Sequence, residues 1–146
     1  MHLIKSTCSV ILVLFSFNSF AFDLSKLEGN WRGVARLGDL DFFAALIIKS
    51  DLSGEYIEAS FTNRNVAKKR TFTVNDIIER DGYIEITIKS ENDIAPQKLI
   101  FVKNGNEIKG MHIATIKEDT VLYYALKLMK SKFPTKTQQG NSNKQL

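Results

Sequence analysis

Apolar and polar residues alternate along most of the chain. In "YIEITIKS", residues 83–90, every second position is apolar: Ile84, Ile86 and Ile88. "YIEASF" shows the same alternation, with apolar residues at Ile57, Ala59 and Phe61. A period of two residues is typical of half-buried β-strands. The pattern predicts eight strands, at about 30–37, 40–50, 55–62, 70–79, 83–90, 97–103, 107–117 and 120–131.

Turn signals separate these segments. They are Gly38-Asp39, Ser53-Gly54, Asp81-Gly82, Asn104-Gly105 and Glu118-Asp119. In the first four, a glycine offers the positive φ that a tight hairpin needs. The longest connection, "TNRNVAKK" at 62–69, has no tight turn, and "LYYALKLMKSK" from Leu122 fits a final strand better than a helix. Short connections between eight strands predict an all-β fold, an eight-stranded antiparallel up-and-down β-barrel.

The two ends of the chain depart from this alternation. Lys5 precedes the apolar run "CSVILVLFSF", and small residues follow at Ser19 and Ala21. These features predict a Sec-type signal peptide at 1–21, because the apolar run is too short to cross a bilayer. The polar segment "SKFPTKTQQGNSNKQL" cannot bury enough apolar surface to fold. We therefore expect a barrel at 22–131 followed by a disordered tail at 132–146.

Cysteine and charge narrow the functional classes. The single cysteine, Cys8, lies in the predicted leader, so the mature chain has no disulfide, which favours a bacterial periplasmic or secreted protein. The 20 Lys and Arg exceed the 16 Asp and Glu, but the excess comes from the two ends of the chain. The predicted barrel is neutral, so a nucleic-acid partner is not expected. The basic run Lys68-Lys69-Arg70 is expected to be a solvated loop.

The start of the predicted barrel carries a short motif, Gly29-Asn30-Trp31, with the only tryptophan in the chain. With its surroundings, "LEGNWRG" followed by an apolar strand, it resembles the opening of the lipocalin and wider calycin group, and in particular small bacterial lipocalin-like domains. The resemblance implies a barrel that Gly29 and Trp31 help to close at one end. It also implies a basic side chain packed against the tryptophan, which here corresponds to Lys130 or Lys132.

Catalysis has little support in the sequence. After removal of the leader, His112 is the only histidine and no cysteine remains, so multi-histidine metal sites and Cys-His pairs are excluded. Carboxylate pairs such as Glu91 with Asp93 lie in predicted turns, where they usually cap or solvate the backbone. We expect no enzyme activity, no catalytic residue, no metal and no cofactor. Inside a barrel, His112 is either a hydrogen-bonded core residue or a ligand contact with room made by Gly110.

Two functional classes remain. The first is a carrier that binds a small apolar or amphipathic molecule inside the barrel, with lumen candidates His112, Tyr124, Phe61 and Phe101. The second is a periplasmic interaction module of the inhibitor or immunity type, with a packed interior. It draws support from strands that are apolar on both faces, which would leave an outer strip at Phe43, Ile47 and Tyr123. A second copy, another periplasmic protein or the inner face of a membrane could cover this strip. Alternatively, the two apolar faces reflect a flattened barrel that packs against its own tail. We expect no stable membrane span after cleavage.

Overall fold

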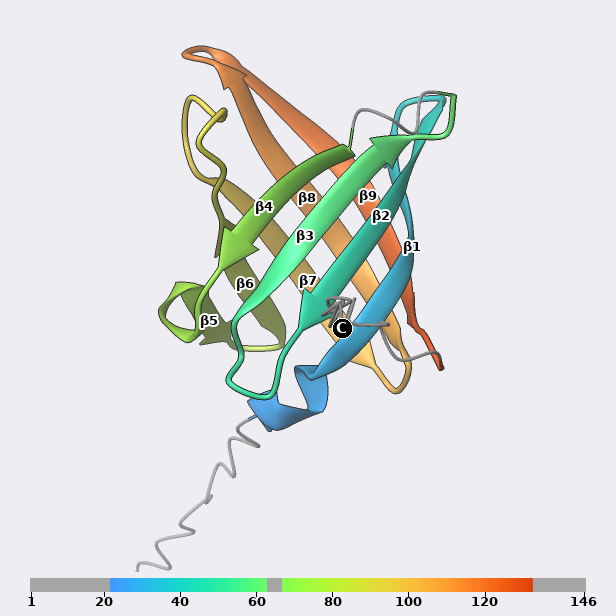
Figure 1. Ribbon diagram of the computed structural model, residues 1–146, viewed down its shortest axis with the longest axis vertical. Coiled ribbons are helices and arrows are strands. Elements are labelled where there is room, and N and C mark those ends of the chain that lie inside the picture. The colour runs from blue at the N-terminus through green and yellow to red at the C-terminus, as the bar shows by residue number, and fades with distance from the viewer. Residues whose placement is uncertain (1–21, 63–66, 133–146) are drawn as a thin grey trace, which may run out of the picture.

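The computed structural model describes residues 22–62 and 67–132 (Figure 1). The predicted leader at 1–21 and nearly all of the predicted tail lie outside the described residues. Within the described part of the chain, no helix is long and apolar enough to cross a membrane.

The chain folds as one antiparallel sheet. The described residues form two short 3-10 helices, η1 (Leu24–Leu27) and η2 (Val74–Asp76), and nine strands: β1 (Gly29–Leu37), β2 (Leu40–Ile48), β3 (Gly54–Ser60), β4 (Ala67–Phe72), β5 (Ile77–Arg80), β6 (Tyr83–Ile88), β7 (Gln97–Asn104), β8 (Glu107–Lys117) and β9 (Thr120–Lys130). The strand order is β4-β3-β2-β1-β9-β8-β7-β6-β5. The prediction of an all-β, up-and-down antiparallel fold is therefore confirmed.

The number of strands and the closure of the sheet differ from the prediction. The expected strand at 70–79 is two strands, because η2 interrupts it. The Thr73 backbone N–H and hydroxyl both donate to the Asp76 carboxylate, and this capping box turns the chain between β4 and β5. The sheet curls into a half-barrel. The edge strand β4 meets the end of β6 at one bridge, where Thr71 and Lys89 exchange backbone hydrogen bonds of 2.9 and 3.0 Å.

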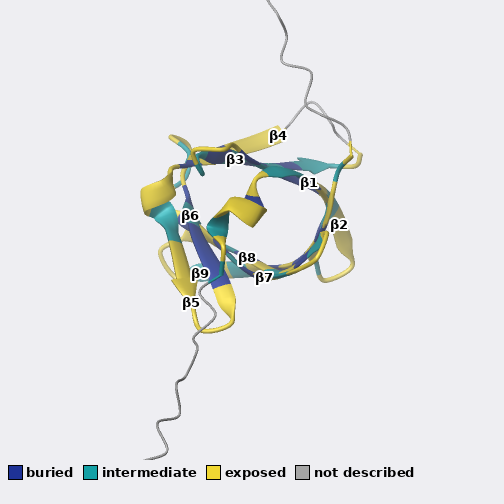
Figure 2. Ribbon diagram, turned by 90° about the horizontal axis from the view of Figure 1, so that it is seen from below, coloured by how far each residue is buried: buried dark blue, intermediate teal, exposed yellow. Residues whose placement is uncertain are grey.

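The short helix η1 lies across one end of the half-barrel, as the view from below shows (Figure 2). Trp31, in β1, contacts η1 at this end. Its ring is fully buried, and its indole N–H donates to the Leu27 carbonyl at 2.8 Å. The ammonium groups of Lys103 and Lys130 lie 5.6 and 5.3 Å from the ring centre. Lys130 is one of the two basic residues that the resemblance placed against the tryptophan. We call this region the Trp31 end.

The core lies on the concave face of the sheet. Alternate residues point inward, as the period of two predicts, and the fully buried side chains beside Trp31 are mainly aliphatic: Leu27, Leu46, Ile86, Ile88, Leu99, Ile108 and Leu128. Each such side chain contributes about 1.5–3 kcal/mol on burial. The positive φ predicted for the tight turns is found at Gly38, Gly82 and Gly105. Between β2 and β3, however, the residue with positive φ is Leu52 rather than Gly54.

Candidate functional site

Strand β3 turns a polar face toward the interior. Tyr56 and Glu58 are buried there, whereas Phe61, a predicted lumen residue, lies beyond the end of β3 and is 48% exposed. Tyr56 pairs with Arg70 of β4 across the sheet, so Arg70 also points inward and is only 4% exposed. The prediction of a loop at Lys68-Lys69-Arg70 was wrong, because all three residues lie in β4. The two lysines are solvent-exposed as expected, but the strand pairing buries Arg70.

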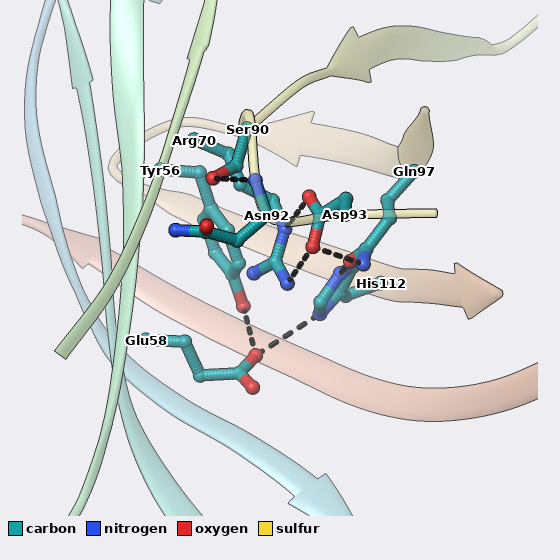
Figure 3. Close-up of polar contacts among 8 residues, drawn as sticks. All are labelled: Tyr56, Glu58, Arg70, Ser90, Asn92, Asp93, Gln97 and His112. Carbon is teal, nitrogen blue, oxygen red and sulfur yellow. Dashed lines mark hydrogen bonds and ion pairs between the residues drawn. The ribbon is translucent and has the colours of Figure 1, made fainter. Parts of the chain in front are cut away.

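Arg70 forms a bidentate ion pair with Asp93. Its Nε donates to Asp93 Oδ2 at 2.7 Å and its Nη2 donates to Asp93 Oδ1 at 2.9 Å (Figure 3). Asp93 lies in the connection between β6 and β7, where its backbone N–H donates to the Ser90 carbonyl. The expectation that Asp93 caps or solvates a turn misses this inward pairing. Asp93 Oδ1 also accepts a hydrogen bond from Gln97 Nε2 at 3.1 Å.

His112, 1% exposed, connects this pair to Glu58. Its Nε2 lies 2.6 Å from Gln97 Oε1 and its Nδ1 lies 3.0 Å from Glu58 Oε2. The Gln97 amide gives its NH₂ to Asp93 and therefore presents its oxygen to His112. Both ring nitrogens thus face acceptor oxygens when Glu58 is ionised, and a protonated imidazole in this position forms an ion pair with Glu58. The ring also stacks on Tyr124, with centroids 5.1 Å apart, and packs edge-to-face with Tyr56, with centroids 5.0 Å apart.

The protonation of these groups follows from their surroundings. Burial acts to raise the pKa of Glu58, but hydrogen bonds from His112 and Tyr56 and the charge of Arg70 outweigh it, and the pKa is lowered. Burial, together with the Glu58 carboxylate, raises the pKa of Tyr56 well above its ordinary value. Tyr56 therefore keeps its proton and donates to Glu58 Oε2 at 2.9 Å. We call these residues the Arg70 cluster: Tyr56, Glu58, Arg70, Asp93, Gln97, His112 and Tyr124.

A cavity of about 170 Å³ adjoins the cluster. Glu58, Arg70, Asp93, Gln97, His112 and Tyr124 contribute to its walls, and Ile94, Ala114 and Ile116 add apolar surface. One polar atom stands out. Arg70 Nη1 is the buried side-chain nitrogen or oxygen that has no hydrogen-bond partner among the described residues. Figure 3 shows Nη1 on the side of the guanidinium toward Tyr56 and Glu58.

The remaining lumen predictions have separate outcomes. Tyr124 lines the cavity. Phe101 is buried in the aliphatic core and contributes nothing to the walls of this cavity. Gly110 makes no room for a ligand, because a Cβ built on it would lie 2.7 Å from the Cβ of Phe101, which pairs with it across β7 and β8.

The convex face carries an apolar groove of about 420 Å³, lined by Phe43, Ile57, Ala59, Ser60, Phe61 and Ala67. The other two residues predicted for an outer strip lie elsewhere. Ile47 is half-buried in β2. Tyr123 is 59% exposed, but β1 separates its strand, β9, from β2. Phe43 and Phe61 therefore share one surface, while Tyr123 does not join it.

Sequence reasoning missed five members of the cluster: Tyr56, Glu58, Arg70, Asp93 and Gln97. One signal was present for Arg70. In "AKKRTF" Phe72 is the single large apolar residue, so it identifies the buried face of the strand, and Arg70 lies two positions earlier on that face. Asp93 and Gln97 gave no comparable signal, because a pairing between segments 23 residues apart does not follow from local alternation.

No three or more His, Cys, Asp or Glu side chains come together as a possible metal site in the described residues. Comparison of the sequence with protein-family models gives no match, and neither curated proteins nor solved structures yield a match. The half-barrel is compatible with a barrel fold. Membership of the lipocalin group stays a prediction.

Proposed function

We propose that the protein binds a small amphipathic molecule in the cavity of the Arg70 cluster. The observation that carries this proposal is that Arg70, which lines the cavity, has a buried Nη1 with no hydrogen-bond partner among the described residues. A buried polar group without a partner costs about 1–3 kcal/mol, and more when it is charged. An acceptor that arrives with a ligand recovers this cost, so the site favours a molecule that presents one.

The cluster is suited to binding rather than to catalysis. Both ring nitrogens of His112 are engaged by Glu58 and Gln97, which leaves no ring nitrogen to take a proton from a substrate. The same contacts hold the side chains in place before a ligand arrives. Such preorganisation lowers the entropy that binding must overcome.

The size of the cavity limits the ligand. Its volume of about 170 Å³ lies below the roughly 300–1,000 Å³ of typical small-molecule pockets. The cavity therefore suits a polar head group with a few carbon atoms. Ile94 and Ile116, both largely exposed, can contact a longer apolar part at the cavity mouth.

Native mass spectrometry of the protein purified from the periplasm tests this proposal, with identification of any molecule released on denaturation. The variant Ala114→Leu narrows the cavity, and Ala125→Leu on the exposed face of β9 is the matched control. We expect a bound molecule in the wild-type protein and in Ala125→Leu, and its loss in Ala114→Leu. Equal occupancy of the two variants would contradict binding in this cavity.

A second candidate function rests on the convex groove. Phe43 and Phe61 are 36% and 48% exposed in it, and exposed apolar patches often mark protein contacts. In this alternative the protein is an interaction module of the inhibitor or immunity type. A stoichiometric complex that Phe61→Ser abolishes and Ala114→Leu leaves intact would favour it.

We also propose that the protein is exported to the periplasm or secreted by a bacterium. The support is the leader with Lys5, its short apolar run and Ala21 at the predicted cleavage site. Fractionation of cells followed by mass determination of the mature chain tests this. A mature protein that begins at Phe22 is expected, and an uncleaved cytoplasmic chain would contradict the proposal.

A further inference from the structure

We propose that the ligand's head group is uncharged and offers a hydrogen-bond acceptor beside a donor, as a carboxamide does. This inference rests on the proposed small-ligand function and adds the chemical class. It is drawn from the charges and the unused hydrogen-bonding atoms around the cavity.

The charges that line the cavity already compensate each other. Arg70 is paired with Asp93, and Glu58 contacts His112, which compensates its charge when the imidazole is protonated. The one further charged residue in the walls is Lys68, which is exposed. A ligand carboxylate near Arg70 would approach Glu58, and a ligand ammonium near Glu58 would approach Arg70. Because such repulsions are strong away from water, either charge is disfavoured.

Hydrogen-bonding capacity, in contrast, is left over. Arg70 Nη1 can still donate. Both contacts of Glu58 use Oε2, so its Oε1 accepts no hydrogen bond from the described residues. The Tyr124 hydroxyl also has no hydrogen-bond partner among them, and it keeps its proton because burial raises the pKa of Tyr124. A carboxamide oxygen accepts from Nη1, while its N–H groups are donors for Glu58 or Tyr124.

The positions of the apolar residues set the orientation of the ligand. Arg70 and His112 are buried, whereas Ile94 is 62% exposed and Ile116 is 44% exposed. The polar head therefore enters first, and the apolar part lies at the mouth. This is the reverse of a pocket that holds an apolar tail at its base.

Titration of the mature chain with three probes of equal length tests the inference: hexanamide, hexanoate and hexylammonium. We expect saturable binding of hexanamide at pH 7, at least about ten-fold tighter than that of either charged probe, with NMR shifts at His112 and Ala114. Hexanoate or hexylammonium binding as tightly as hexanamide would overturn the head-group assignment.

The variant Arg70→Lys sharpens the test. Its ammonium can still pair with Asp93, but it lacks the planar fork that leaves Nη1 as a further donor without a partner in the described residues. We expect a loss of at least about ten-fold in hexanamide affinity. The control Lys69→Met lies on the next residue and faces outward, where Lys69 pairs with Glu55, and its affinity should equal that of the wild-type protein. If Arg70→Lys binds hexanamide as tightly as the wild-type protein, Nη1 does not contribute to binding of the head group.

Failure of this inference and failure of the proposed function give different results. A bound native molecule with a charged head group would overturn the inference and leave the proposed function standing. If no probe binds the wild-type protein more tightly than Ala114→Leu, and no native molecule is found, the cavity holds water only and both proposals fail.

We infer a second feature from a separate observation near the start of the described chain. The backbone nitrogen of Phe22 donates to Glu79 Oε1 in β5, and Phe22 packs against the core. Cleavage after Ala21, as proposed above, would turn this amide into an ammonium group. Glu79 is then the partner of the mature N-terminus, and the ion pair ties the chain start to the four-residue edge strand β5.

An NMR titration of the α-amino group tests this pairing. The neighbouring charged groups that line the adjoining cavity are Asp23, Lys26, Arg80 and Lys103, and all of them stay unchanged in the test variants. We expect the α-amino pKa to lie above its ordinary value of about 7.7–8.0 and to fall in Glu79→Gln. It should not move in the control Glu28→Gln.

Adding one glycine before Phe22 displaces the amino group from Glu79, and the pKa should then return to its ordinary value. An α-amino pKa that is the same in Glu79→Gln as in the wild-type protein would overturn the pairing. A mature chain that starts at another residue would instead overturn the cleavage site on which the pairing depends.

Discussion

The Trp31 end and the Arg70 cluster occupy the same concave face but satisfy their polar atoms differently. At the Trp31 end, the indole N–H finds the Leu27 carbonyl, and aliphatic side chains fill the surroundings. In the Arg70 cluster, ionised and amide groups bind one another, yet Nη1 of Arg70 has no partner in the described residues. Among the described residues, the first region leaves no buried side-chain nitrogen or oxygen without a partner, whereas the second leaves Arg70 Nη1, which a ligand can use.

The two regions should therefore differ in how much they contribute to the stability of the fold. Burying a large aromatic ring stabilises a fold directly. A buried ion pair gains less, because the loss of hydration opposes the attraction, and apolar replacement of both partners is often neutral or stabilising. The Arg70–Asp93 pair is therefore poorly explained by stability alone, which agrees with the ligand binding proposed above.

Removing Trp31 should produce the largest effect. Trp31→Ala deletes a fully buried ring, and such changes cost about 3–5 kcal/mol. Urea unfolding monitored by circular dichroism measures the loss in the free energy of unfolding. Trp31→Phe keeps most of the packing but leaves the Leu27 carbonyl without its donor, which costs about 1–3 kcal/mol. A decrease in the free energy of unfolding of less than about 1 kcal/mol in Trp31→Ala would contradict the view that the Trp31 end is the region that stabilises the fold.

In the Arg70 cluster, a single substitution should lower the free energy of unfolding more than the double substitution that removes both partners of the ion pair. Arg70→Met leaves Asp93 unpaired, and removal of one partner of a buried pair costs about 3–5 kcal/mol. Because Asp93 is 12% exposed, the lower end of this range is expected. The double variant Arg70→Met with Asp93→Leu should recover most of the stability in urea unfolding and still fail to bind the ligand. A double variant that stays as unstable as Arg70→Met would mean that the pair is structural.

The fold could be predicted from the sequence because alternation and turn residues are local signals. The inward positions of β6 and β9 follow directly from the period of two. The split of the 70–79 segment could not be read in the same way, because the capping box of Thr73 and Asp76 competes with extended structure within an otherwise strand-like run. Closure depends on how far the whole sheet curls, for which no local pattern exists.

The site was harder to predict, and β3 shows why. We assigned its apolar residues Ile57, Ala59 and Phe61 to the interior, but the polar face with Tyr56 and Glu58 is the buried one. Hydrophobic patterning assumes an apolar interior. It fails where the interior is a polar network, since Glu58 is stabilised by His112, which lies 54 positions away in the sequence. His112 was identified because it is the single histidine of the described chain, whereas its partners are common residue types.

The pH dependence of stability tests the Glu58–His112 pair with a smaller effect. The pKa of Glu58 lies below its ordinary value of 4.5 in the folded protein. The unfolded chain thus binds more protons in this range, so the pair's contribution is complete above pH 4.5 and is lost as the pH falls through the folded pKa. The difference in urea midpoint between the wild-type protein and Glu58→Gln should shrink from pH 5.5 to pH 3. Other carboxylates with lowered pKa, such as Asp41 and Asp76, cancel in this difference. A difference that stays constant with pH would show that ionised Glu58 is not what stabilises the pair.

The convex groove should respond least. Phe61 is 48% exposed and lies outside the buried core, so Phe61→Ser should change the free energy of unfolding by at most about 0.5 kcal/mol. Ligand affinity should also be unchanged, because the groove and the cavity share no lining residue. Urea unfolding and the hexanamide titration measure both quantities on one variant. A loss of ligand affinity in Phe61→Ser would show that the convex and concave faces are coupled through β3. Ligand binding would then depend on residues of both faces of the sheet and not on the concave face alone.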